Sequence, residues 1–337
     1  MKILVVSPAW IGDAVMAQSL YKIIKRDQPE CQLSVLAPSW TLPILRRMSE
    51  VNANVLSPFN HGELRLKERF SLARRIRESR FDQAVILTNS FKSALIPYLA
   101  QIPIRTSWLG EFRYGLINDI RDDSLRHKCL MIERFAALTP ASRPPSKDLI
   151  PYPRLAVNKN NVNSLINDNQ ISLERETIIF CPGAEFGIAK RWPTYHFAVL
   201  VDYYLQLGWN TIILGSDKDK TIAAEITNLT STNNSCLYDL TGKTSIEDAL
   251  DLLSISRLVL TNDSGLMHLA AAVGASLVAL YGPTSPALTP PLSTSSTLIR
   301  KGTGFSSKRV GDRKDGYDTS LFEISPEEVI EALNGLL

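Results

Sequence analysis

The chain has 337 residues, of which 45% are apolar and 21% are charged, with 37 Lys and Arg against 34 Asp and Glu. This composition is typical of a soluble globular protein and excludes collagen-like, disulfide-scaffold and disordered chains. The sequence contains no apolar run of the roughly 20 residues that a membrane-spanning helix needs. At this length we expect two domains.

Charge is unevenly distributed along the chain. Residues 1–157 carry 23 Lys and Arg against 14 Asp and Glu, a net charge of +9, whereas residues 158–337 carry 14 against 20, a net charge of −6. A basic half attracts nucleic acid, an anionic membrane face or a phosphorylated lipid, although interleaved glutamates also fit a solvated helix face. No recognised nucleic-acid-binding motif accompanies the charge, so we expect no nucleic-acid partner.

The cysteines and the first residues of the chain indicate the compartment. The four cysteines, Cys31, Cys129, Cys181 and Cys236, form no CxxC pair and no Cys/His cluster. This pattern predicts buried thiols in a reducing compartment and argues against structural zinc. The first residues lack a long apolar stretch and a cleavage site, so we expect no signal peptide and a cytoplasmic protein.

Short β-rich apolar runs alternate with longer helical patterns in the first half of the chain. The expected strands are 3–7, 33–37 and 84–88, and the expected helices include 14–25 and 63–77. Strands separated by helices predict a parallel sheet that is covered on both faces. We expect the linker at 141–153, which is rich in proline and polar residues.

A second series of the same kind follows the linker. Its expected strands are 177–181, 210–214, 258–261 and 277–281, and its expected helices are 195–207, one from about residue 220, 245–253 and 265–273. We therefore predict an α/β protein with two Rossmann-like, doubly wound domains facing a cleft, over residues 1–150 and 151–337. The closing helix at 326–336 either stays with the second domain or packs back on the first.

The loop after the first strand carries a candidate catalytic residue. Open parallel sheets bind ligands outside the carboxyl ends of their strands, so the loops that follow strands are the places to search. Asp13 is here either a helix N-cap, whose carboxylate accepts a backbone N–H, or a general base for a hydroxyl. Gly12 is the only glycine of this loop, which therefore cannot be a GxGxxG dinucleotide fingerprint.

The loop at 182–193 combines glycines with cations. Gly183 and Gly187 allow the backbone to approach a ligand, and Lys190 and Arg191 supply positive charge. This pattern fits a grip on a diphosphate, and it also fits an ordinary loop with surface cations.

The loop after the strand at 258–261 leads directly into a helix. Asp263 or Ser264 can cap that helix, whose first turn then offers free N–H groups and a positive dipole end to a phosphate. His268 lies one turn into the helix, where it either contacts the same ligand or is a satisfied helix histidine.

Other classes of chemistry have no support in the sequence. There is no GxSxG and no HExxH, so a serine hydrolase or a zinc protease is not predicted. No carboxylate pair is spaced to hold Mg²⁺, so we expect neither a metal nor a cofactor. Lys190, Arg191 and the helix dipole would then supply the counter-charge for a diphosphate.

Taken together, these segments resemble the bacterial ADP-heptose–lipopolysaccharide heptosyltransferases of glycosyltransferase family 9, and among them the heptosyltransferase II group. The resemblance runs over nearly the whole chain. It is carried by residues 10–13, 89–94, 113–119, 182–193, 261–268 and 279–283. Ile188 stands where this family is expected to have proline, and 304–318 is the least familiar segment.

The resemblance implies a GT-B enzyme with the acceptor in the first domain and the donor in the second. The implied reaction is an inverting transfer of L-glycero-D-manno-heptose from ADP-heptose to the first heptose of the lipopolysaccharide inner core. The acceptor, heptosyl-Kdo2-lipid A, implies a peripheral enzyme at the cytoplasmic face of the inner membrane, where the basic first half would dock.

The resemblance also implies roles for individual residues. Asp13 matches the base and Lys190 the residue that stabilises the departing diphosphate. Lys92 and Arg113 are expected to contact an acceptor phosphate. The implied donor-site residues are Gly183, Lys190, Arg191, Asp263, Ser264, Gly265, Leu266 and His268.

Three other functions remain as alternatives. Two are enzymes, namely another GT-B nucleotide-sugar transferase or a nucleotide-sugar epimerase. The third is a two-lobed solute-binding protein without chemistry, which would require export and is disfavoured by the absence of a signal peptide. ADP release from ADP-heptose on addition of acceptor separates an enzyme from a solute-binding protein.

Overall fold

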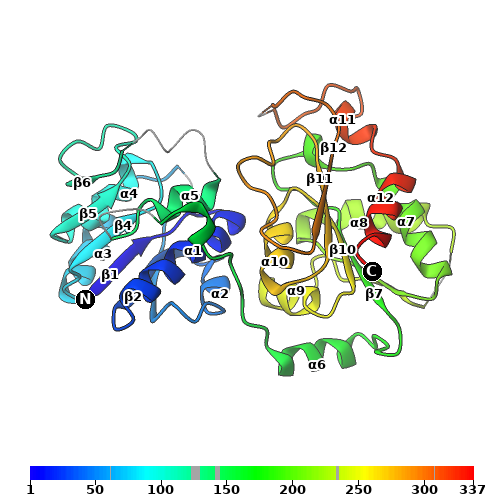
Figure 1. The fold of residues 1–337 in the computed structure, drawn as a ribbon, viewed down its shortest axis with the longest axis horizontal. Coiled ribbons are helices and arrows are strands. Elements are labelled where there is room, and N and C mark those ends of the chain that lie inside the picture. The colour runs from blue at the N-terminus through cyan, green and yellow to red at the C-terminus, as the bar shows by residue number, and fades with distance from the viewer. Residues whose placement is uncertain (61, 123–129, 141–144, 233–234, 307) are drawn as a thin grey trace. The chain divides into compact units, whose positions relative to one another are not determined.

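The chain forms two compact units, Met1–Pro153 and Arg154–Leu337 (Figure 1). The computed structural model describes residues 1–337 except 61, 123–129, 141–144, 233–234 and 307. Cys129 and the first four residues of the expected linker therefore lie outside the described residues. Each unit is a parallel sheet with helices, which confirms the predicted pair of Rossmann-like, doubly wound α/β domains.

The first unit is built on a sheet in the order β3-β2-β1-β4-β5-β6. Its strands are β1 (Lys2–Val6), β2 (Gln32–Pro38), β3 (Ala53–Ser57), β4 (Gln83–Ile86), β5 (Ile104–Ser107) and β6 (Asp119–Ile120). Its helices are α1 (Ile11–Asp27), α2 (Leu42–Leu45), α3 (Leu66–Glu78), α4 (Phe91–Leu99) and α5 (Met131–Ala136). The strand order reverses where β1 pairs with both β2 and β4, and ligands bind at such a reversal.

Local sequence explains which elements were predicted. β1 and β4 are buried along nearly their whole length, so they appear as continuous apolar runs. β3 has no buried residue and β6 has only two residues, so neither gives a clear pattern. The first helix begins at Ile11, three residues earlier than expected, so Gly12 and Asp13 belong to its first turn.

The second unit repeats this arrangement in the order β12-β11-β10-β7-β8-β9. Its strands are β7 (Thr177–Cys181), β8 (Asn210–Ile213), β9 (Leu237–Asp239), β10 (Leu258–Asn262), β11 (Leu277–Tyr281) and β12 (Ser296–Arg300). Its helices are α6 (Lys159–Asp168), α7 (Thr194–Gln206), α8 (Lys220–Leu229), α9 (Ile246–Leu253), α10 (Gly265–Val273), α11 (Thr319–Phe322) and α12 (Pro326–Asn334). The reversal lies between β7 and β10, which pair in parallel.

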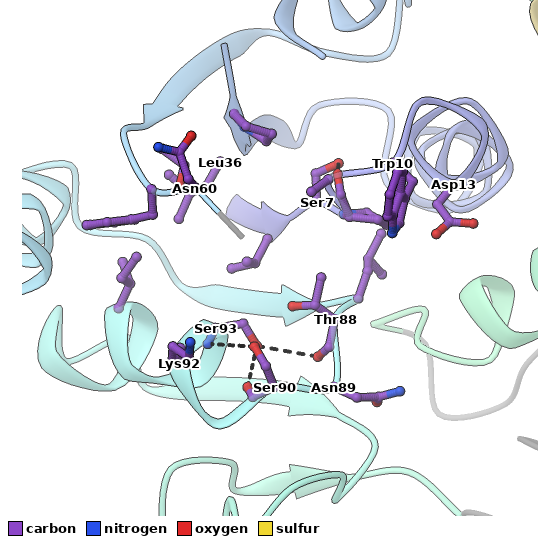
Figure 2. A pocket seen from close by; sticks show the side chains of 18 of the residues that line it. Ser7, Trp10, Asp13, Leu36, Asn60, Thr88, Asn89, Ser90, Lys92 and Ser93 are labelled. Carbon is purple, nitrogen blue, oxygen red and sulfur yellow. Dashed lines mark hydrogen bonds between the residues drawn. The ribbon is translucent and has the colours of Figure 1, made fainter. Parts of the chain in front are cut away.

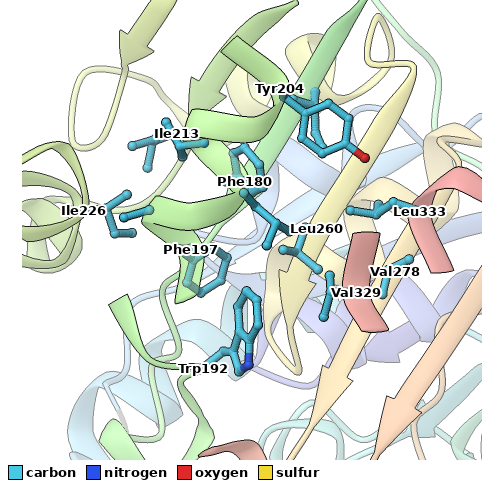
Figure 3. Packing of buried hydrophobic residues seen from close by; sticks show 14 of the residues in the cluster. Phe180, Trp192, Phe197, Tyr204, Ile213, Ile226, Leu260, Val278, Val329 and Leu333 are labelled. Atoms are coloured by element: carbon cyan, nitrogen blue, oxygen red, sulfur yellow. The ribbon is translucent and has the colours of Figure 1, made fainter. Parts of the chain in front are cut away.

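An aromatic core anchors the end of the loop after β7 (Figure 3). The Phe180 ring lies 6.1 Å from that of Phe197 in an edge-on arrangement, and the Trp192 ring lies 5.0 Å from the Phe197 ring. The buried Trp192 indole also donates a hydrogen bond of 3.0 Å to the carbonyl of Ile324. A buried Trp whose N–H has a hydrogen-bond partner holds its segment of the chain in place. The backbone that carries Lys190 and Arg191, just before Trp192, is therefore fixed at this end.

The last helix, α12, belongs to the second unit. Val329 and Leu333 are fully buried in the same core as Phe180, and α12 packs against α7 and β11. The buried face of this helix therefore packs within its own unit. The apolar face of an amphipathic helix can be buried only once, and α12 buries it here.

The described cysteines are buried, and none of them forms a disulfide. They are Cys31, Cys181 and Cys236. Burial raises the pKa of the Cys181 thiol, and the nearby Asp219 carboxylate adds to that effect. A protonated, buried thiol is unreactive, as the isolated spacing predicts.

Candidate active site

The first unit contains a cavity of about 550 Å³ at the point where its strand order reverses (Figure 2). Residues that follow β1 and β4 form much of its lining. They are Ser7, Pro8, Ala9, Trp10 and Asp13 after β1, and Leu87, Thr88, Asn89, Ser90, Lys92 and Ser93 after β4. The whole lining combines carboxylates, cations and neutral polar groups, in a space large enough for a sugar.

Asp13 lies in the first turn of α1 and does not cap that helix. Trp10 is the residue that precedes the helix, and it makes no side-chain capping bond. The carboxylate of Asp13 has no hydrogen-bond partner among the described residues, and burial raises its pKa to about 6. The N-cap alternative is therefore wrong. With this pKa the carboxylate is mostly ionised at pH 7 and still basic enough to accept a proton, which suits a general base.

Lys92 lines the cavity with its ammonium already engaged. Its Nζ donates to the carbonyl of Gly62, and the neighbouring Arg69 donates to the carbonyls of Glu63 and Leu64. The two cations therefore hold the chain segment that precedes α3 against the start of α4. A ligand that binds Lys92 must compete with the Gly62 carbonyl.

Arg113 supports the cavity wall and does not line it. Its side chain is fully buried, and its guanidinium donates to the carbonyls of Leu109 and Thr88 and to the Ser107 hydroxyl. Gly110 has φ +57°, and a Cβ there would lie 2.8 Å from Arg113 Nη2. The expectation that Arg113 contacts an acceptor phosphate is therefore a misassignment, because a fully buried guanidinium with these partners cannot reach a ligand.

Arg134 is a cavity residue that the sequence did not single out. It lies on α5, and its buried Nε has no hydrogen-bond partner within the described part of the chain. Asn89 Oδ1 and Thr88 Oγ1, which also belong to lining residues, are buried without a partner in the same way. Buried polar atoms normally have partners, so these three atoms are candidates to bind a ligand. Arg134 lies in none of the recognised segments, so no sequence signal could have identified it.

In the second unit, Lys190 and Asp263 form an ion pair between the loops that follow β7 and β10. Lys190 Nζ lies 2.7 Å from Asp263 Oδ2, and the two side chains are only 16% and 10% exposed. The same carboxylate oxygen accepts a hydrogen bond of 2.7 Å from the Thr284 hydroxyl. Two residues assigned to the donor site are thus brought together, although 73 positions separate them.

The Asn262 side chain forms hydrogen bonds to both ends of the loop after β7. The sequence did not predict this role. Its Oδ1 accepts from the backbone N–H of Trp192 at 3.1 Å, and its Nδ2 donates to the carbonyl of Pro182 at 2.7 Å. Asn262 is fully buried. A single amide side chain therefore fixes the span of the loop that carries Lys190. Asn262 lies within the recognised segment 261–268, but its spacing gives no indication of this role.

Gly183 and Arg191 lie around the carboxylate of Asp219. A Cβ at Gly183 would come within 2.6 Å of that carboxylate, so glycine allows the close approach. Arg191 Nη2 lies 3.9 Å from Asp219 Oδ1 and donates to the carbonyl of Ala184. Asp219 itself is held by Ser216, whose N–H and hydroxyl both donate to it. Sequence reasoning missed Asp219, because it lies in a different loop.

The start of α10 has no side-chain cap. Ser264 precedes Gly265 without a capping bond, and the Asp263 carboxylate accepts from Lys190 instead. The expected cap from Asp263 or Ser264 is therefore wrong, and the first-turn N–H groups, including that of Leu266, have no capping side chain. Such N–H groups bind anions well.

His268 is buried one turn into α10. Burial lowers its pKa to about 4, although the nearby Asp263 opposes that shift. The imidazole is therefore neutral near pH 7 and contributes no charge to this site.

Among the described residues, no group of three or more His, Cys, Asp or Glu side chains could hold a metal ion.

Comparisons with known proteins point to one family. The family model described as glycosyltransferase family 9 (heptosyltransferase) matches residues 69–317. The chain is 46% identical to lipopolysaccharide heptosyltransferase 2 of Salmonella typhimurium, over 100% of this chain and 99% of that protein. It is 42% identical to lipooligosaccharide heptosyltransferase 2 of Haemophilus ducreyi, with the same coverage. The solved structure of E. coli ADP-heptose lps heptosyltransferase II matches with a TM-score of 0.88 and 42% identity, over 100% of this chain and 98% of that one.

Proposed function

The chain belongs to glycosyltransferase family 9, the heptosyltransferases, and we propose from this premise that it transfers heptose from ADP-heptose to the lipopolysaccharide inner core. The specific transfer proposed is that of L-glycero-D-manno-heptose to the first heptose of the acceptor, with inversion at the anomeric carbon. Family membership supports an enzyme and argues against a solute-binding protein.

The observation that carries the proposed mechanism is the unpaired carboxylate of Asp13 in the cavity of the first unit. Asp13 removes the proton from the acceptor hydroxyl as the oxygen attacks the anomeric carbon of the donor. The bond from that carbon to the diphosphate oxygen breaks, and ADP leaves with the electron pair. The unpartnered polar atoms of Thr88, Asn89 and Arg134 support acceptor binding in the same cavity.

The second unit supplies the features expected of a donor site. The free N–H groups of α10 and the Lys190 ammonium are suited to a diphosphate, and Asn262 holds the loop that carries Lys190. Gly183, at the start of that loop, lets the Asp219 carboxylate pack against the backbone. We infer that Asp263 positions Lys190, because its carboxylate would repel a diphosphate directly.

We further propose that the enzyme works at the cytoplasmic face of the inner membrane by docking on the lipid surface. Within the described chain, no helix is long and apolar enough to cross a membrane. One stripe of α3 supports docking, because it exposes apolar residues beside cations and carries no acidic residue. Its members are Leu66, Lys67, Phe70, Arg74 and Arg77, all exposed.

The surface beside this stripe has the same character. α4 packs next to α3, and its Tyr98 is 45% exposed. Phe70, Arg77 and Tyr98 line a shallow hollow between the two helices. Exposed rings combined with cations suit the interface of an anionic bilayer, where each Lys or Arg near the surface contributes about 1 kcal/mol.

The reaction can be tested directly with purified enzyme. ADP-heptose and heptosyl-Kdo2-lipid A should together give ADP and an acceptor heavier by one heptose, and neither substrate alone should release ADP. ADP release with Kdo2-lipid A, which lacks the first heptose, would instead assign a different transfer. No ADP release with either acceptor would contradict the proposal.

A further inference from the structure

Arg309, in the segment 304–318 for which the sequence predicted no role, packs on the loop that carries Lys190. The backbone N–H of Ala189 donates to the carbonyl of Arg309 at 3.4 Å. Gly187 has φ +122°, and a Cβ there would lie 2.5 Å from the same carbonyl oxygen. Only glycine fits at this contact, so the two segments are shaped to each other.

The contact brings the side chain of Arg309 to the same aromatic ring as Lys190. The guanidinium carbon of Arg309 lies 5.3 Å from the centre of the Phe186 ring, and Lys190 Nζ lies 5.4 Å from it. Arg309 is exposed. Its guanidinium makes no hydrogen bond or ion pair with the residues that the structure describes.

The charges of the donor site explain why this cation matters. Lys190 is paired with Asp263 at 2.7 Å, and Arg191 faces Asp219 at 3.9 Å. His268 is neutral near pH 7. The two predicted cations are therefore each opposed by a carboxylate, and the side chains of this group carry no net charge. A diphosphate brings several negative charges, so these residues alone do not neutralise it.

Two other cations near the loop are already engaged. Lys218 pairs with Glu185. Arg300 donates to the carbonyls of Gly282 and Gly302. Recruiting either cation would break hydrogen bonds or ion pairs, whereas the Arg309 guanidinium has none with the described residues and contacts only the Phe186 ring.

We propose that Arg309 binds the diphosphate of the donor beside Lys190 and balances its negative charge as ADP departs. This inference rests on the proposed function of the second unit. A guanidinium presents planar N–H donors that match a phosphate in two-point contact. Because Arg309 has no carboxylate partner in the described structure, its full charge is available to the ligand. The unfamiliar segment thereby gains a role in donor binding.

The test compares Arg309→Ala with Lys308→Ala, which removes the same charge from the adjacent exposed residue. Titration calorimetry with ADP and with AMP, which has one phosphate fewer, measures affinity. Arg309→Ala should weaken ADP binding about tenfold, weaken AMP binding less, and leave the melting temperature unchanged. Arg309→Lys should recover part of the loss, and Lys308→Ala should bind ADP like the wild type.

The outcomes separate this inference from the proposed function. Wild-type ADP affinity in Arg309→Ala, or equal losses in Arg309→Ala and Lys308→Ala, would overturn the role of Arg309. An equal loss for ADP and AMP without recovery by lysine would also overturn it, because a packing role predicts that result. Failure of the wild type to bind ADP at all would instead count against the proposed function itself.

Discussion

Lys190 Nζ lies 2.7 Å from Asp263 Oδ2, so the cation assigned to the leaving group is held by a carboxylate from the neighbouring strand's loop. The pair lies where β7 and β10 run side by side, at the reversal of the strand order. Asp263 holds Lys190 in place and, in the proposed donor site, reduces the positive charge that a donor would meet. Removing either residue therefore changes both the geometry and the charge of the site.

Lys190→Ala should lower kcat more than it weakens donor binding. Negative charge grows on the diphosphate as the glycosidic bond breaks, so an ammonium helps the transition state most. The loss should be about 10²–10³ in rate, or about 2.7–4 kcal/mol. Steady-state kinetics at saturating acceptor check this. A raised donor KM with unchanged kcat would leave Lys190 as a donor anchor only.

A double variant separates the charge of Asp263 from the role of Lys190. In Lys190→Ala the Asp263 carboxylate keeps the Thr284 hydroxyl but loses its cationic partner, so it repels the diphosphate. We expect Lys190→Ala/Asp263→Asn to be less impaired than the two single variants predict, with a coupling of about 0.5–3 kcal/mol. Strict additivity in the same kinetic assay would show that the pair does not act as a unit.

Asp13→Asn should abolish turnover with little change in donor affinity. The amide keeps the shape of the side chain but cannot accept a proton, and loss of a general base costs about 10²–10⁴-fold. In the wild type, kcat/KM should fall as the pH drops below about 6, where the Asp13 carboxylate becomes protonated. A fully active, folded Asp13→Asn enzyme would remove Asp13 from the catalytic residues.

The same substitution should stabilise the fold at neutral pH. The pKa of Asp13 is about 6 in the folded protein against 3.8 as its ordinary value. The folded state therefore holds this proton more tightly, and the contribution of Asp13 to stability falls as pH rises from about 4 to about 6. The cost above pH 6 is at most about 3 kcal/mol. Urea unfolding at pH 4 and pH 7 should show that Asp13→Asn has a higher free energy of unfolding than the wild type only at pH 7.

Activity should not require a divalent metal. The proposed donor site offers Lys190, Arg309 and the N-terminus of α10 as counter-charges, and the carboxylates of Asp263 and Asp219 are engaged with cations or hydroxyls. Assays after EDTA treatment should match untreated enzyme. Activity that is lost in EDTA and restored by Mg²⁺ would contradict this expectation.

Lys67→Glu should weaken binding to anionic vesicles if the α3 stripe docks on the membrane. Reversing the charge of Lys67 should lower the affinity for vesicles of phosphatidylcholine and phosphatidylglycerol about tenfold. Binding to vesicles of phosphatidylcholine alone should be weak. Lys159→Glu is the matched control, because Lys159 is also exposed but lies in the second unit. Co-sedimentation measures both. Equal losses in the two variants would indicate general electrostatic attraction without a docking face.

The sequence by itself determined the alternation of strands and helices and the loops on which the chemistry would lie. Those features depend on local properties, namely apolar runs such as β1 and β7, glycines in tight loops, and the helical periodicity of segments such as α10. Asp13, Lys190 and Asp263 could be named in advance because each follows a strand, and parallel strands direct their carboxyl ends to one edge of the sheet.

Only the tertiary structure decided what each named residue contacts. The neighbours of a side chain depend on strand order and burial, which local sequence does not encode. Lys190 meets Asp263 because β10 pairs with β7, Arg113 is buried under the wall that it supports, and Arg309 reaches Phe186 from a segment after the last strand. The raised pKa of Asp13 has the same origin, because desolvation comes from atoms that the fold brings around the carboxylate.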